Sequence, residues 1–348
     1  MKVCFIVNPA AGAGSAFQKQ VDKAAANLSK KGCEVKQVKT EGQGDATDLA
    51  RQAADNGFDV AVAVGGDGTI NEVCNGLVGS NTALAVLPAG TGNVYAADLG
   101  IPIWNPLYPE AITQAAELIM TGHRRRIDLG QVHLSTGISR YFLMWCGIGL
   151  DAAITQVMRS GPVRELNYAS WVVSGVMVAL DFMGKPATII TDAGTVRERV
   201  LMMVVSNGQL YGRIWRIAPD AKMDDGLLDV AYVTGHRWPA TVRYVLGLTF
   251  GQHVKDPDFR LHRTTRLCLS TKESLPVHVD AEPIGATPVE IEVAPSALEV
   301  IVPDNAPRRL FEPDPTWPEP ENPLDESLKR LRDGVRRDAQ FLKDLFAP

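Results

Sequence analysis

The 348-residue chain has no excess of basic residues, because 35 Lys and Arg stand against 40 Asp and Glu, a formal net charge of −5. Such a chain has no surplus charge to neutralise a phosphate backbone, which excludes a general nucleic-acid binder, so we expect no nucleic-acid partner. The five cysteines are odd in number and scattered, and none forms a Cys-x-x-Cys pair. They indicate the reduced thiols of a cytosolic protein.

Long hydrophobic runs are also missing. The longest apolar stretch, from Trp171 to Leu180, contains Ser174 and is followed by Asp181, whereas a bilayer-spanning helix needs about 20 apolar residues. We therefore expect a cytoplasmic protein that is soluble or associates peripherally with a membrane. Helices that are apolar all round are usually buried, so we expect this stretch to be a core helix, the alternative being a wall where an acyl chain enters.

Two common nucleotide-binding signatures are absent. The sequence holds no Gly-x-x-x-x-Gly-Lys-Ser/Thr motif, which excludes a P-loop kinase. Its first glycine loop, Asn8 to Gly14, lacks the Gly-x-Gly-x-x-Gly spacing of dinucleotide-binding proteins. A Rossmann oxidoreductase is therefore disfavoured.

What the chain does have is a glycine-rich turn directly after a buried strand. The apolar run Val60–Val64 leads into Gly65-Gly66-Asp67-Gly68-Thr69-Ile70-Asn71-Glu72 and then a predicted helix. Glycines expose backbone N–H groups where no Cβ blocks a phosphate, and a helix N-terminus lies behind them. Asp67 adds little to such a turn, but beside phosphates its carboxylate suits a magnesium ion or its water shell. Thr69 and Glu72 have the spacing of a capping box, so we expect Glu72 to be structural.

The first 100 residues alternate strands with helices. We expect strands at residues 3–7, 34–39, 60–64 and 83–87, with a helix after each of the first three. This alternation predicts a parallel sheet covered on both faces, with ligands bound outside the carboxyl ends of its strands. The glycine loops after the first, third and fourth strands should then face one crevice.

From about Arg126 onward, short strands broken by Gly, Asp and Pro predict a β-rich second domain. The basic run His123–Arg126 before it is expected to be a solvated helix end, the alternative being contact with anionic lipid headgroups. Seven prolines between Pro303 and Pro323 predict a stiff linker. Residues 324–348 predict an amphipathic helix, whose mixed charges favour packing on the protein or pairing in a homodimer over lying on a membrane. Further strands are expected at residues 141–146, 188–191, 200–205, 228–232, 266–269, 277–279, 289–293 and 298–302, and helical stretches near 151–183 and 239–251.

Several short motifs occur in a fixed order along the chain, and together they resemble the diacylglycerol kinase catalytic-domain family. The resemblance covers roughly residues 1 to 303 and points to the bacterial lipid-kinase branch, which is similar to sphingosine and ceramide kinases. The Gly-Gly-Asp-Gly-Thr motif on its own is weak evidence for this family, since NAD kinases and phosphofructokinases have similar turns. The motifs are Asn8-Pro9-x-x-Gly12, Gly65–Glu72, Pro88-Ala89-Gly90-Thr91-Gly92-Asn93, Leu99–Pro102, Asp128-Leu129-Gly130, and Asp224-Asp225-Gly226 with Asp229.

The resemblance implies an α/β N-terminal domain over residues 1–127, of the NAD kinase and diacylglycerol kinase type, and a β-sandwich lipid-acceptor domain over residues 128–297. ATP would lie in the cleft between them, and the strand near 298–302 would return to the first domain. The family's nucleotide contacts fall on Asn8, Pro9, Ala10, Ala11, Gly12, Thr40, Gly65, Gly66, Asp67, Gly68, Thr69, Ile70, Asn71, Gly90 and Thr91.

The family's Asp-Gly-Glu motif is represented here by Asp280-Ala281-Glu282. Taken alone, these residues predict a turn between strands. By resemblance, either Asp280 or Glu282 is the base that takes a proton from the lipid hydroxyl, and Asp67 belongs to the catalytic group. Two departures stand out: Ala281 replaces the middle glycine, and Val94 occupies a position where many members have Asp.

The resemblance also implies two metal sites. Asp67 and Asp128 would support the magnesium that accompanies ATP. A second, structural cation would bind the Asp225 carboxylate and the carbonyls of Lys222 and Leu227, although a hairpin turn explains the same residues.

The sequence thus predicts an ATP- and Mg²⁺-dependent kinase that phosphorylates a lipid hydroxyl at a membrane surface. The acceptor would be diacylglycerol or a related lipid such as a sphingoid base. Two alternatives stay open: an NAD kinase, and a non-catalytic, nucleotide-binding lipid sensor.

Overall fold

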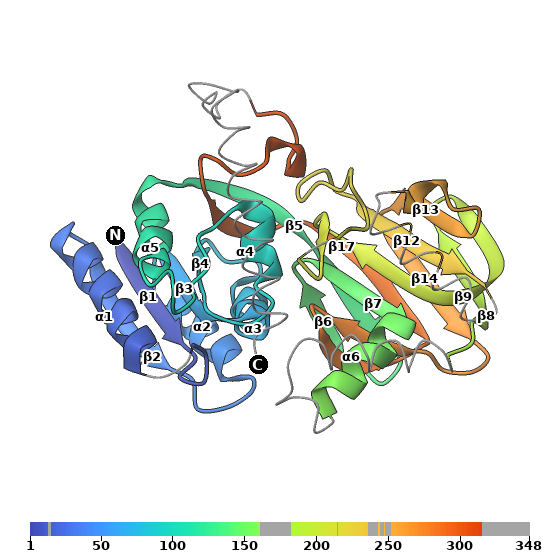
Figure 1. The fold of residues 1–348 in the computed structure, drawn as a ribbon, viewed down its shortest axis with the longest axis horizontal. Helices are drawn as coiled ribbons and strands as arrows, with labels where there is room; N and C mark the ends of the chain where they lie inside the picture. The colour runs from blue at the N-terminus through green and yellow to red at the C-terminus, as the bar shows by residue number, and fades with distance from the viewer. Residues whose placement is uncertain are drawn as a thin grey trace.

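The computed structural model of the chain describes residues 1–12, 15–160, 182–213, 215–235, 243, 247 and 252–314. The apolar stretch from Trp171 to Leu180, most of the helix predicted near 239–251 and the helix predicted over 324–348 lie outside these residues. Figure 1 shows two lobes joined by two long strands. In the part of the chain described, no helix is long and apolar enough to cross a membrane.

The N-terminal lobe is built on a parallel sheet in the order β2-β1-β3-β4. Every residue of β3 and β4 is buried, which requires cover on both faces of the sheet. Helix α1 packs beside α5, and α2 packs beside α3. The strands are β1 (Lys2–Val7), β2 (Glu34–Lys39), β3 (Val60–Gly65) and β4 (Ala83–Pro88), and the helices are α1 (Ser15–Lys30), α2 (Asp45–Asp55), α3 (Asp67–Leu77), α4 (Val94–Leu99) and α5 (Ala111–Thr121).

Small residues allow the helices α2 and α3 to pack closely. The buried positions of α2 are Ala46, Ala50 and Ala53, which form one apolar stripe at helical spacing. Opposite them, a Cβ added at Gly76 of α3 would lie 2.3 Å from the Thr47 carbonyl oxygen. The close contact therefore requires glycine, and it holds α3 in place beneath the end of β3.

The C-terminal lobe is a β-rich domain, as predicted. Its strands run mainly antiparallel in the order β16-β15-β7-β9-β8-β14-β17, of which β17 is Val289–Val302. Its core includes buried residues such as Phe142, Ile148 and Val205. Its elements are β6 (Ser139–Phe142), β7 (Trp145–Gly149), α6 (Leu150–Ser160), β8 (Lys185–Thr191), β9 (Gly194–Ser206), β10 (Leu210–Tyr211), β11 (Trp215–Arg216), β12 (Leu228–Thr234), η2 (His253–Lys255), β13 (Phe259–Thr264), β14 (Arg266–Thr271), β15 (Pro276–Val279) and β16 (Glu282–Ala286).

Strands β5 (His123–Leu134) and β17 (Val289–Val302) run through both lobes and pair antiparallel with each other. In β17, Val300 also pairs in parallel with Leu84 of β4, so the last strand returns to the first domain. The two strands predicted at 289–293 and 298–302 form this one strand, with a register shift between Ala294 and Leu298. Both domains therefore share continuous backbone pairing.

The basic run was predicted wrongly. Helix α5 ends at Thr121, and His123–Arg126 forms the start of β5 rather than a solvated helix end. Arg124 and Arg126 both lie beside Glu299 of β17, Arg124 at 2.9 Å and Arg126 at 3.8 Å. Ion pairs between neighbouring strands therefore account for Arg124 and Arg126. The helix prediction had explained the basic run by its interaction with a helix dipole.

The single strand predicted over residues 141–146 is two strands, β6 and β7. They are separated at Leu143 and Met144, whose N–H groups bind the Asp280 carboxylate, as does that of Trp145. A side chain from a distant turn therefore interrupts the strand, which local sequence cannot reveal.

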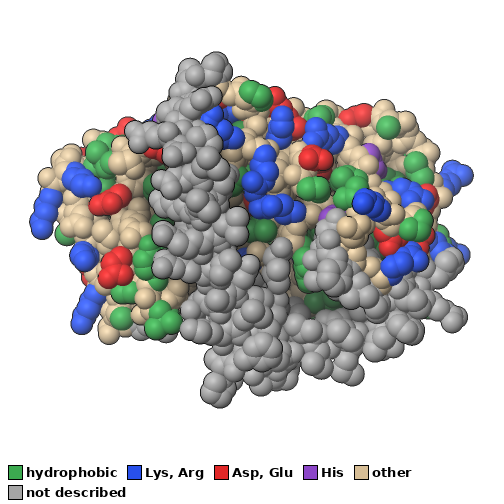
Figure 2. All heavy atoms as spheres, turned by 45° about the horizontal axis from the view of Figure 1, so that its top comes forward, with side chains coloured by type: hydrophobic (Ala, Val, Ile, Leu, Met, Phe, Trp, Pro, Cys, Tyr) green, Lys and Arg blue, Asp and Glu red, His purple; other side chains and the backbone are tan. Residues whose placement is uncertain are grey.

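The stiff linker predicted from Pro303 is contradicted for residues 303–314. The short helix η3 (Arg308–Leu310) lies there, and Ala306, Leu310 and Phe311 are buried. The Arg125 guanidinium lies over the Phe311 ring and pairs with Asp224 at 2.7 Å. On the face drawn in Figure 2, Lys and Arg side chains are mixed with Asp and Glu side chains, which matches the near balance of charge.

Candidate active site

The three predicted glycine loops meet at the carboxyl end of the N-terminal sheet. Asn8 donates a hydrogen bond to the Thr69 hydroxyl (Nδ2 to Oγ1, 3.0 Å) and accepts one from the Ala10 N–H at 2.9 Å. Thr40, at the end of β2, joins the same edge because its N–H donates to the Val7 carbonyl at 3.0 Å. The first loop, the end of β2 and the Gly65–Glu72 turn are therefore locked together by hydrogen bonds.

The second and third loops touch through their glycines. A Cβ added at Gly90 would lie 2.4 Å from the Gly66 Cα, and one added at Gly65 would lie 2.6 Å from the Thr69 hydroxyl oxygen. Asn93 has a left-handed backbone (φ 50°), and its side chain both accepts from the Gly90 N–H and donates to the Gly90 carbonyl. The third loop is thus held as a compact ring against Gly66.

Asp67 is the first residue of α3 and lies between these two loops. Its Oδ1 accepts the Val94 N–H at 2.7 Å, and a Cβ at Gly92 would lie 2.4 Å from its Oδ2. Burial raises the pKa of Asp67 to about 6, against the lowering effect of the Val94 and Asn93 backbone hydrogen bonds. A single carboxylate beside phosphates fits magnesium, which usually takes one or two carboxylates plus substrate oxygens.

Glu72 is structural, as expected, but it does not form the predicted capping box. Helix α3 begins at Asp67 with Gly66 as its N-cap and no side-chain cap. Glu72 instead accepts the N–H groups of Gly44 (3.0 Å) and Ala46 (3.2 Å), at the start of α2. Its negative charge therefore stabilises the N-terminus of the neighbouring helix.

Asp280, from the second domain, reaches the same helix. The Asn71 side-chain amide donates to Asp280 Oδ2 at 2.8 Å, and the Leu143 N–H donates to the same oxygen at 2.8 Å. Oδ1 accepts the N–H groups of Met144 (2.9 Å) and Trp145 (3.1 Å). Burial raises the pKa of Asp280, and these hydrogen bonds oppose that rise. All four acceptor positions of this carboxylate are therefore filled by N–H donors.

The predicted turn between strands is present and connects β15 to β16. Val279 pairs with Glu282, and the two residues between them, Asp280 (φ 44°) and Ala281 (φ 64°), are both left-handed. This is the geometry of a type I′ hairpin turn. Ala281 therefore occupies a position that favours glycine, which explains why the family's motif has glycine there.

Glu282 follows the turn and faces the N-terminal domain. Its Oε2 accepts a hydrogen bond from Arg140 Nη2 at 2.9 Å, and its Oε1 accepts one from the Gln43 side chain, in the loop before α2. Arg140 also donates twice to the Asn71 side-chain oxygen, at 3.0 and 2.8 Å. Residues of both domains thus hold Glu282 beside the helix that begins at Asp67.

Comparisons with known proteins fit this arrangement. The family model described as diacylglycerol kinase catalytic domain matches residues 2–132, and the one described as YegS C-terminal NAD kinase beta sandwich-like domain matches residues 145–302. Residues 2–132 belong to the diacylglycerol kinase catalytic-domain family, and the second model extends the match to residue 302. Members of this family are lipid kinases, and the chain is an enzyme of that class. Membership of a kinase family implies that the enzyme uses ATP.

Individual relatives cover nearly the same span. The diacylglycerol kinase of Bacillus subtilis is 28% identical over 307 residues, which is 88% of this chain and 97% of that protein. The diacylglycerol kinase of Mycobacterium tuberculosis is 27% identical over 305 residues, 87% of this chain and 95% of that protein. The crystal structure of a provisionally assigned diacylglycerol kinase from Bacillus anthracis aligns with a TM-score of 0.69 at 26% identity, covering 86% of this chain and 97% of that one.

The two predicted metal sites differ in their surroundings. Asp128 is buried, and its oxygens accept the N–H groups of Gly226 and Ser296, both at 2.7 Å. These contacts place Asp128 with the predicted structural site at Lys222–Leu227, not with the glycine loops around Asp67.

At that second site, Asp225 accepts the Leu227 N–H at 3.1 Å and lies 3.7 Å from the guanidinium of Arg263. Burial raises the pKa of Asp225, while Arg263 lowers it. The described residues hold no group of three or more His, Cys, Asp or Glu side chains placed to bind a metal. The structural cation stays a prediction.

Several residues of the site carry no sequence signal. Gln43 and Arg140 contact Glu282 but belong to no motif. Behind the turn, the Ala281 N–H donates to His278 Nδ1 at 3.2 Å, so His278 Nε2 carries the proton and donates to Asp151 at 2.7 Å. Apart from the local contact between Ala281 and His278, these contacts join residues far apart in the chain, and only the fold brings them together.

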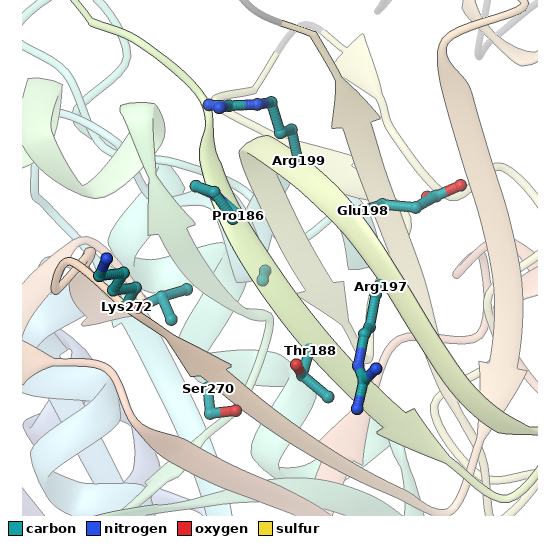
Figure 3. A pocket seen from close by; sticks show the side chains of 9 residues that line it. Pro186, Thr188, Arg197, Glu198, Arg199, Ser270 and Lys272 are labelled. Atoms are coloured by element: carbon teal, nitrogen blue, oxygen red, sulfur yellow. The ribbon is translucent and has the colours of Figure 1, made fainter.

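One groove of the described surface lies elsewhere. It has a volume of about 560 Å³ and is formed by the neighbouring strands β8, β9 and β14, with Arg197, Arg199 and Lys272 around it (Figure 3). None of its lining residues belongs to the glycine loops or to the β15–β16 turn. The groove is therefore not part of the candidate active site.

Proposed function

We propose that the enzyme transfers the γ-phosphoryl group of ATP, with Mg²⁺, to the hydroxyl of diacylglycerol or a related lipid such as a sphingoid base. The observation that carries this proposal is the position of Glu282. Its carboxylate belongs to the second domain, yet Gln43 and Arg140 hold it beside the helix that begins at Asp67. A phosphate donor on the glycine loops and a base on the other domain would thus face each other.

Glu282, rather than Asp280, is the base in this proposal. Each carboxylate has about four acceptor positions. At Asp280 all four are taken by N–H groups, so no position is free for a substrate hydroxyl. Glu282 accepts from Gln43 and Arg140 and retains acceptor capacity for a hydroxyl proton. Asp280 acts by fixing the turn that carries Glu282.

The transfer step conserves atoms and charge. The lipid hydroxyl oxygen forms a bond to the γ-phosphorus while the bond to the bridging oxygen of ADP breaks, and ADP leaves with that electron pair. The hydroxyl proton passes to a Glu282 oxygen. The N–H groups of the glycine loops bind the phosphates, and Asp67 would hold the magnesium, which supplies charge neutralisation when bound.

Action at a membrane surface belongs to this proposal, because the acceptor is a lipid. We propose that the nucleotide binds the residues of the three loops that the family resemblance implies. Thr91 is exposed at the tip of the third loop. A homodimer through the C-terminal segment stays a prediction, because that segment lies outside the described residues.

The test is transfer of radiolabel from ATP and Mg²⁺ to a panel of diacylglycerol, sphingoid base, ceramide and phosphatidylglycerol in mixed micelles. We expect one labelled lipid with the wild type and none with Asp67→Ala. Label on NAD and on no lipid would favour the NAD kinase. ATP binding without transfer to any acceptor would favour the sensor.

A further inference from the structure

The three glycine loops carry no positive side chain. Residues 8–15, 65–72 and 88–94 contain no Lys or Arg, and the second of these segments contains Asp67 and Glu72. ATP brings several negative charges to this place, and phosphoryl transfer is catalysed mainly by positioning and by neutralising charge on the phosphates. Backbone N–H groups alone supply only partial charges. Mg²⁺ would neutralise part of the charge, and a cationic side chain from elsewhere in the fold would neutralise more of it.

The hairpin of β10 and β11 brings an arginine from the second domain to these loops. Its base is fixed on α4, because Asp98 Oδ2 accepts the N–H groups of Gln209 (3.0 Å) and Leu210 (3.1 Å). At its tip, Arg213 Nη1 donates to the Thr91 carbonyl at 3.4 Å. The guanidinium therefore lies at the rim of the third loop, which also contacts Asp67.

Two further facts set Arg213 apart from a surface arginine. Thr91, whose carbonyl accepts the hydrogen bond of Arg213, precedes Gly92, where an added Cβ would lie 2.4 Å from Asp67 Oδ2. Arg213 also has a left-handed backbone (φ 70°), a conformation that residues other than glycine rarely adopt. Such conformations are concentrated at ligand-binding and catalytic positions.

We propose that Arg213 is a catalytic residue that binds the nucleotide phosphates from the second domain. The forked guanidinium suits two phosphate oxygens at once, which an ammonium group cannot match. In the nucleotide-free protein the guanidinium donates to the Thr91 carbonyl; with ATP present, the phosphates take the place of that carbonyl. This proposal rests on the proposed kinase function, whose acceptor it does not specify.

The backbone of Arg213 makes a sharp test possible. Arg213→Gly removes the guanidinium and also relieves the left-handed backbone, so the melting temperature should not fall. We expect ATP to bind about tenfold more weakly and kcat to fall by about a hundredfold. Arg213→Lys keeps the charge without the fork and should fall between the wild type and Arg213→Gly. Arg216→Ala, which removes an exposed arginine from the same hairpin, should stay within about twofold of the wild type in both ATP affinity and kcat.

ATP affinity is measured by titration calorimetry and kcat with the accepted lipid. Wild-type ATP affinity and kcat in Arg213→Gly would overturn the proposal, and so would equal losses in Arg213→Gly and Arg216→Ala. If no lipid is phosphorylated by the wild type, the kinase function fails while the calorimetry still decides the phosphate contact.

Discussion

Asn71 of α3 donates a hydrogen bond to Asp280 of the β15–β16 turn, with 2.8 Å between the amide nitrogen and the carboxylate oxygen. The same side chain accepts two hydrogen bonds from Arg140, which pairs with Glu282. The helix that follows the Gly65–Glu72 turn is therefore joined directly to the turn that carries the proposed base. The nucleotide loops and the base are positioned relative to each other by one buried side chain.

Replacing Asn71 with Leu should destabilise the protein by about 2–3 kcal/mol, because Asp280 and Arg140 each lose a buried hydrogen-bond partner. Urea unfolding measures the difference. Gln52→Leu, at an exposed position on α2, serves as the control and should change the free energy of unfolding by less than about 0.5 kcal/mol. Equal stability of the two variants would mean that the Asn71 network contributes nothing to folding.

Ala281→Gly should stabilise the protein by roughly 1 kcal/mol, because Ala281 has φ 64° and a left-handed alanine costs about that much. Thermal or urea unfolding provides the measurement. The same change at Ala54, within α2, should instead cost about 1 kcal/mol, since glycine weakens a helix. A loss of stability at both positions would contradict the turn geometry.

Gly90→Ala should abolish high-affinity ATP binding while leaving the fold intact. The new Cβ would lie 2.4 Å from the Gly66 Cα, so the second and third loops must separate. Titration calorimetry with ATP, alongside circular dichroism, tests both parts. Gly42→Ala is the matched control, because nothing lies within 4 Å of a Cβ at that position and Gly42 is not among the nucleotide contacts. ATP binding by Gly90→Ala at wild-type affinity would show that the contact between the loops is not required.

Asp67 should make the protein less stable as the pH rises. Its pKa is about 6 in the folded state against an ordinary value of 3.8, so the folded state binds the proton more tightly than the unfolded state. Its contribution is therefore most favourable below about pH 4 and is lost as the pH rises through about 6. Asp67→Asn removes this loss, because the amide is always neutral.

At pH 8, Asp67→Asn should be more stable than the wild type by roughly 2 kcal/mol, a value reduced for partial solvent exposure. At pH 4 the two should be about equal. Urea unfolding at both values gives the difference, and the variant should also lose kinase activity. A variant less stable than the wild type at pH 8 would contradict the burial of a charged Asp67.

The sequence predicts the first domain well, because its strands are apolar on both faces and each glycine loop follows a strand directly. The Gly65–Glu72 turn was found by its residue types, whereas the role of Asp280-Ala281-Glu282 followed from the family resemblance. What local sequence could not predict depends on distant partners. Glu72 binds the N-terminus of α2, Arg124 pairs with Glu299, and Asp280 divides residues 141–146 into two strands.

The choice between Asp280 and Glu282 has the same origin. Both are acids in one short motif, and their difference appears only when their partners are counted, since Asp280 is saturated by N–H groups from two other segments. Gln43, Arg140 and Arg213 belong to no motif and acquire meaning only in the fold. Tertiary contacts, not local pattern, assign these roles.

The most direct test of this account is a single-turnover measurement of phosphoryl transfer to diacylglycerol, with Glu282→Gln compared with the wild type. Removing a general base while keeping the side-chain shape should lower the transfer rate by about a hundredfold or more, with ATP affinity unchanged. Transfer by Glu282→Gln at the wild-type rate would contradict Glu282 as the base. A wild type that transfers to no lipid would contradict the proposed function itself.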